Sequence, residues 1–103
     1  PKALRPIAWT AFLMKKFDLS RQYYEQIISK KPTVHDFLNA GHVQLCTGNM
    51  KKALEFYKQA AQKEDDFEQF VTLFESDKNN LIEFGIDKQL LPYLFDQIQY
   101  GLE

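Results

Sequence analysis

The sequence predicts an all-α protein made of tandem antiparallel helical hairpins with a helical C-terminal cap. Three observations lead to this prediction: the composition, an internal repeat and the spacing of apolar residues. Aromatic residues make up 15% of the 103 residues, whereas glycine and proline each occur only four times. Such a composition favours helices that pack through large side chains and are joined by short turns. Hydrophobic residues reach 45%, which is enough for a folded core.

The internal repeat has an offset of 33 residues, because Lys15–Pro32 aligns with Gly48–Asp65. Each segment contains a turn, a large apolar residue, a small residue and then an aromatic residue. Another helical stretch precedes each segment, over residues 7–14 and 34–46. We therefore expect two helix–turn–helix units in tandem. The aligned pairs are Phe17 and Met50, Ser20 and Ala53, Tyr24 and Tyr57, and Ile27 and Ala60.

The last third of the chain does not repeat this pattern. Residues 67–74 place apolar side chains at the i, i+3, i+4 and i+7 positions of an amphipathic helix. Asp65 or Asp66 can cap the start of that helix. A short helix follows, and Gly85 marks its end as a residue suited to the left-handed conformation.

The final helix is expected after Asp87, which is its predicted N-cap. Regular helix begins only near Leu90 or Leu91, because Pro92 restricts the residues that precede it. A tandem array leaves an apolar face on its last repeat, and an atypical terminal element commonly covers it. We interpret residues 67–103 as such a cap, and the alternative is the start of a separate module.

The second unit resembles a tetratricopeptide repeat (TPR), a helical hairpin of about 34 residues. The resemblance lies in the segment FLNAGHVQLCTGNMKKALEFYKQAAQKED, in which Ala53 lets the second helix lie close to the first near Gly41. The first unit matches less closely, with Ala8 in place of the small glycine and Pro6 inside the first helix. The matching residues are Phe37, Ala40, Gly41, Gly48, Asn49, Ala53, Tyr57 and Ala60.

The resemblance implies one TPR-like domain over residues 1–103. Repeat one covers residues 1–33, repeat two covers residues 34–66, and the helical cap covers residues 67–103.

The resemblance also implies where a partner binds. In TPR proteins the first helices of successive repeats line a concave groove that holds a peptide, and some members grip a C-terminal carboxylate with Lys, Asn and Arg side chains. Here only Arg5 and Asn39 occupy such positions, and Trp9 stands where an Asn is needed, which argues against this clamp. The groove is apolar with imidazoles, which suits an amphipathic helix or an extended peptide. Its expected residues are Arg5, Trp9, Phe12, His35, Leu38, Asn39, His42 and Leu45.

An alternative concerns the N-terminal face. The chain has no initiator Met and no signal-peptide pattern, so we expect it to be a piece of a longer protein. Trp9, Phe12 and Leu13 would then pack against a preceding repeat instead of a partner.

His42 and Cys46 are candidates for a metal or thiol site, because residues four apart share a helix face. A structural zinc site needs four ligands, and the sequence offers no second Cys and no matching His. A catalytic Cys46 needs an activating base and an orienting carboxylate; His42 lies one turn away, but no orienting carboxylate can be assigned. Glycine-rich phosphate loops and hydrolase signatures are also absent. We expect neither catalysis nor a cofactor.

The charge and the cysteine content restrict the partners. Net charge is −1, from 13 basic and 14 acidic residues, which provides no electrostatic footprint for nucleic acid or an anionic membrane. No apolar run approaches the ~20 residues of a membrane span. A single cysteine excludes an internal disulfide and favours a reducing compartment such as the cytoplasm.

These observations predict a protein–protein interaction scaffold that binds a partner peptide or helix in the concave groove. The alternatives are self-association into a homo-oligomer through the exposed N-terminal face and the metal or thiol site at His42 and Cys46.

Overall fold

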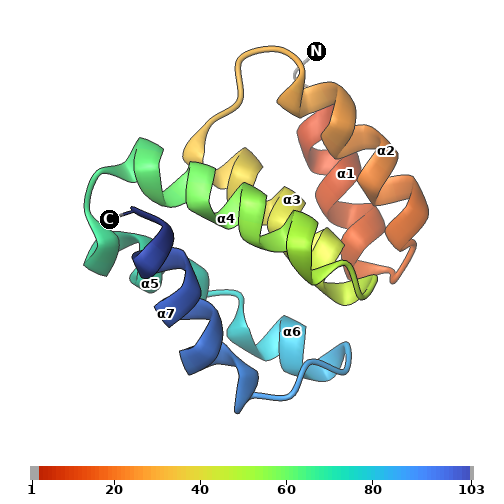
Figure 1. Ribbon diagram of the computed structural model, residues 1–103. Helices are drawn as coiled ribbons and strands as arrows, with labels where there is room; N and C mark the ends of the chain where they lie inside the picture. Colours follow the sequence, from red (N-terminus) through yellow and green to blue (C-terminus); the bar gives the residue numbers. More distant parts are fainter. Residues whose placement is uncertain (1–2, 103) are drawn as a thin grey trace.

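The computed structural model describes residues 3–102, and this part of the chain folds into seven α-helices without a β-strand (Figure 1). The predicted all-α class is confirmed. Figure 1 shows a first hairpin on one side of the molecule, α3 and α4 in the middle, and the C-terminal helices on the other side. The helices are α1 (Leu4–Leu13), α2 (Phe17–Ile28), α3 (Val34–Cys46), α4 (Met50–Glu64), α5 (Phe67–Glu75), α6 (Lys78–Glu83) and α7 (Leu90–Leu102).

The first hairpin consists of α1 packed against α2. Pro6 lies in the first turn of α1, where backbone N–H groups have no partner within the helix, so the proline does not interrupt it. The hydroxyl of Ser20 on α2 donates a buried hydrogen bond of 2.8 Å to the carbonyl oxygen of Ala8 on α1. This bond satisfies a polar side chain at a position where the second hairpin has an alanine, Ala53.

The second hairpin consists of α3 packed against α4. A capping box starts α3, because Thr33 and Asp36 each accept a hydrogen bond from the other's backbone N–H. Gly48, in the turn to α4, has φ 82°, and Lys15 at the equivalent turn of the first hairpin has φ 62°. The repeat in the sequence therefore extends to the left-handed conformation of the two turns.

The C-terminal helices follow their local sequence signals. Asp66 caps α5 by accepting hydrogen bonds from the N–H groups of Glu68 and Gln69, whereas Asp65 adopts φ 63° at the end of α4. Gly85 ends the α6 segment with φ 102°. The last helix begins at Leu90, and these predicted positions are confirmed.

The last helix covers the second hairpin, because α7 packs against α4. It buries Leu91, Leu94 and Ile98. The segment after α6 reaches farther, to the first hairpin. The ring of Phe84 lies 5.2 Å from Phe12 on α1 (centroid to centroid) and 5.7 Å from Phe17 on α2. One core therefore joins all three parts of the chain.

Candidate interaction surface

The structure separates the eight residues that the sequence assigned to a concave groove. Arg5 and His35 are exposed, and Trp9 and Asn39 are partly buried. The other four side chains have almost no contact with solvent, so they do not line an open groove. These four are Phe12, Leu38, His42 and Leu45.

Phe12 is covered by aromatic side chains from three segments. Its ring lies 5.1 Å from Trp9, 5.7 Å from Phe17 and 5.2 Å from Phe84, all between centroids. Phe84 belongs to the C-terminal segment, which the sequence interpretation placed only over the second hairpin. The segment therefore fills part of the surface that had been expected to receive a peptide.

His42 is fully buried and uses both ring nitrogens within the core. Its Nδ1 lies 2.8 Å from the Tyr57 hydroxyl and its Nε2 lies 3.0 Å from Oδ2 of Asp77. A carboxylate only accepts hydrogen bonds, so Nε2 carries the proton and Nδ1 of the neutral ring accepts from Tyr57. Burial lowers the pKa of His42, although Asp77 opposes this effect. The imidazole is a neutral structural group and not a contact for a ligand.

Arg5 is engaged by the protein itself. Its guanidinium makes hydrogen bonds of 2.7 to 3.1 Å to both carboxylate oxygens of Asp36 on α3. Burial raises the pKa of Asp36, but the hydrogen bonds from Arg5 and Thr33 outweigh it and leave that pKa below its usual value. This bidentate pair joins the starts of α1 and α3. Arg5 is therefore not free to bind the carboxylate of a peptide.

The thiol candidate is not activated. Cys46 is partly buried, and this burial raises its pKa to about 11, so the thiol stays protonated at neutral pH. Both nitrogens of His42, its expected partner, are already hydrogen-bonded. Within residues 3–102 no three His, Cys, Asp or Glu side chains lie close enough together to hold a metal ion.

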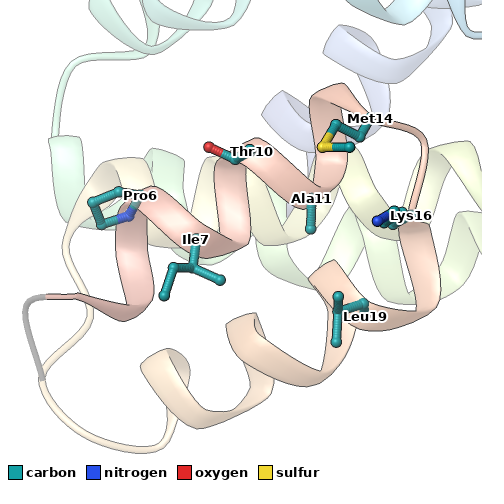
Figure 2. A pocket seen from close by; sticks show the side chains of 7 residues that line it. All are labelled: Pro6, Ile7, Thr10, Ala11, Met14, Lys16 and Leu19. Carbon is teal, nitrogen blue, oxygen red and sulfur yellow. The ribbon is translucent and has the colours of Figure 1, made fainter.

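The open surface of the first hairpin is a groove between α1 and α2, which we call the α1–α2 groove (Figure 2). It has a volume of about 290 Å³. Ile7 of α1, Met14 directly after α1 and Leu19 of α2 are 46%, 59% and 40% exposed. Ile7, Thr10 and Met14 lie on one side because they follow one another at spacings of three and four positions. The groove is lined by Pro6, Ile7, Thr10, Ala11, Met14, Lys16 and Leu19.

The α1–α2 groove is apolar with a single charged side chain at one end. Lys16 follows α1 in the turn, and Figure 2 shows it at the end of the groove near Met14 and Leu19. Lys16 takes part in none of the ion pairs found among residues 3–102. The arrangement can bury apolar side chains of another molecule and attract a negative charge at one end.

The sequence interpretation missed this surface, although the signal was present. Ile7, Thr10 and Met14 have the spacing of a helical stripe. The predicted groove instead contained Trp9 and Phe12, because the TPR resemblance places those positions in it.

None of the helices in residues 3–102 is long and apolar enough to cross a membrane. Comparison with known proteins provides no relative: no protein-family model, no curated protein and no solved structure matches this chain significantly.

Proposed function

We propose that this protein is a non-catalytic protein–protein interaction module, and that its α1–α2 groove binds an apolar helix of a partner protein. The observation that carries the proposal is the set of exposed apolar side chains along this groove. Ile7, Met14 and Leu19 all line the groove, and each is at least 40% exposed. Contiguous apolar surface of this kind marks interaction sites on soluble proteins. The two hairpins, with their matching turns at Lys15 and Gly48, support a TPR-like arrangement, which commonly serves binding.

The shape and chemistry of the groove favour a helix over a small molecule. Small-molecule sites fix the orientation of the ligand with a few precisely placed polar groups that converge on it. Among the residues that line this groove only Thr10 and Lys16 are polar, and Lys16 lies at its end. An amphipathic helix, by contrast, needs a long apolar channel that accepts side chains at i, i+3 or i+4, and i+7.

The concave face is the less favoured surface. Its remaining accessible residues are Arg5, Trp9, His35 and Asn39, and Arg5 is held by Asp36. Self-association is the second candidate, because a second copy of the chain could cover the exposed apolar side chains of Ile7, Met14 and Leu19.

The proposal is tested by selecting binders from a displayed library of helical peptides. We expect the selected peptides to lose at least about tenfold in affinity for an Ile7→Glu/Met14→Glu variant, because a bound apolar helix would have to bury the two introduced carboxylates. Leu13→Glu is the matched control. Leu13 lies on the same helix with almost the same exposure as Ile7, but it does not line the groove.

Two results would contradict the proposed site. Peptides that bind the double variant as tightly as the wild type would place the binding surface elsewhere, and loss of binding in a Trp9→Ala variant alone would point to the concave face. Sedimentation of the wild type and the double variant tests self-association. A wild-type dimer that the double substitution converts to a monomer would establish it. Melting curves confirm that each variant is folded.

A further inference from the structure

The face of α1 that lines the α1–α2 groove has an equivalent on α3 in the second hairpin, and there it is covered. At the offset of 33 residues, Ala40 corresponds to Ile7 and Val43 to Thr10. Ala40 and Val43 are 2% and 1% exposed, whereas Ile7 is 46% exposed and Thr10 is also exposed. The α1 side of the groove is therefore covered in the second hairpin, whereas Thr47, Asn49 and Lys52, the equivalents of Met14, Lys16 and Leu19, remain exposed there.

The covering element is the first hairpin. Asp36, Ala40 and Val43 follow one another at i, i+4 and i+7, so they form one stripe of α3. Asp36 is bonded to Arg5 of α1, which shows that this stripe faces the first hairpin. The helix that packs most directly on α3 from that side is α2. In the second hairpin, the element that covers this face of α3 is therefore an amphipathic helix, α2.

The packing of α2 on α3 also predicts the direction of a helix bound to α1. Only residues 29–33 separate α2 from α3, and neighbouring helices joined by so short a link run antiparallel. A helix placed in the same way on the first hairpin runs antiparallel to α1. Its N-terminal end then lies beside Met14 and Lys16, at the C-terminal end of α1.

The charge of Lys16 restricts the sequence of the bound helix. The N-terminus of a helix carries partial positive charge, which Lys16 would repel. An acidic residue in the first turn removes this conflict and pairs with a lysine that has no ion pair among residues 3–102. The first turn of α2 contains such a residue, Asp18.

We propose that the α1–α2 groove binds an amphipathic helix supplied by another protein, antiparallel to α1, with an acidic residue of its first turn beside Lys16. This inference rests on the proposed function, and it adds the orientation and the charge of the partner.

The probe is a helix-stabilised synthetic peptide that copies residues 17–31, FDLSRQYYEQIISKK. We expect it to bind the intact protein and to lose at least about tenfold in affinity for the Ile7→Glu/Met14→Glu variant. Leu13→Glu should change the affinity less than about twofold. Lys16→Glu should weaken binding about two- to fivefold, the range of an exposed ion pair, and a peptide with Asp18→Lys should restore it.

Orientation is measured with a nitroxide at either end of the peptide and amide signals of the protein. An N-terminal label should broaden the signals of Met14 and Lys16, and a C-terminal label should broaden that of Ile7. The reverse pattern would overturn the antiparallel orientation while leaving the proposed function intact. Absence of binding by this peptide, together with failure of every library peptide, would overturn both.

Two further outcomes would also overturn the inference. Broadening at Ala40 and Val43 would show that the peptide replaces α2 instead of occupying the groove. A wild-type dimer that dissociates in the Ile7→Glu/Met14→Glu variant would show that a second copy of this chain covers the groove.

Discussion

His42 connects more parts of the molecule than any other single polar side chain described above. It lies on α3 and is hydrogen-bonded to Tyr57 on α4 and to Asp77 between α5 and α6. The rings of Phe12 and Phe74 lie against it. A buried donor or acceptor that loses its partner costs about 1–3 kcal/mol. This network therefore favours one relative position of α3, α4 and the turn between α5 and α6.

The burial of His42 predicts that acid destabilises the protein. Its folded-state pKa is lowered by burial, so below about pH 6.5 the unfolded chain binds a proton that the folded protein does not. The free energy of unfolding should change little between pH 8 and that pH. It should then decrease by at most about 1.4 kcal/mol per pH unit until the folded-state pKa is reached. Urea unfolding at several pH values between 8 and 5 measures this change in the free energy of unfolding.

Neither Tyr57 nor Asp36 contributes in this pH range. Burial raises the pKa of Tyr57 well above 10, and the contribution of Asp36 is lost only below its unfolded-state value near 3.8. In the folded protein the ring proton signals of His42 should titrate with a midpoint below 6.5. Stability that increases on acidification would instead mean that the buried imidazole is charged and paired with Asp77.

At the scale of the helices, the crossing of α3 and α4 depends on one missing methyl group. A Cβ atom on Gly41 would lie 2.5 Å from the ring of Tyr57, far inside van der Waals contact. The ring cannot move aside, because it is fully buried and its hydroxyl is bonded to His42. The sequence interpretation assigned the close approach to Ala53, and the structure places the Tyr57 ring directly against the glycine.

Gly41→Ala should therefore destabilise the protein. Overpacking costs about 1–3 kcal/mol, and the higher helix propensity of alanine recovers only up to about 1 kcal/mol. Thermal or urea unfolding measures the difference. Gly101→Ala is the matched control, since it is also helical but meets only the flexible end of Lys58. A Gly41→Ala variant as stable as the Gly101→Ala variant would contradict this account of the crossing.

At the scale of the whole molecule, stability depends on the C-terminal helices that close the core. α7 packs on α4, and Phe95 of α7 lies 5.0 Å from Phe74 of α5 between ring centroids. These contacts join α7 to the helices that hold His42 and Tyr57. The core is therefore continuous from α1 to α7 rather than divided into separate hairpins.

Deletion of residues 87–103 should abolish cooperative unfolding or cause aggregation. The deletion removes Leu91, Leu94 and Ile98, which are buried, and exposes the apolar side of α5. Calorimetry and light scattering of the shortened chain measure the effect. Tyr100→Ser is a suitable control because Tyr100 is 76% exposed. A shortened chain that remains monomeric and melts like the intact protein would show that α7 is an appendage.

The sequence by itself determined the helices and the turns between them. Asp66, Gly85 and Leu90 lie at the predicted helix ends, because caps, left-handed turns and proline effects depend on a few adjacent residues. The matching turns at Lys15 and Gly48 follow from the repeat for the same reason. Local interactions were enough for this part of the fold.

Only the tertiary structure decided which helix faces stay open. Phe12 and His42 stand at positions that the TPR resemblance assigns to the groove, yet Phe84 and Asp77 cover them from a distant part of the chain. Helical periodicity shows that residues share a face, but it does not show which other element packs on it. Ile7 and Met14 remain exposed because no described segment lies over them, so long-range packing places the candidate site in the α1–α2 groove and not in the groove that the resemblance implied.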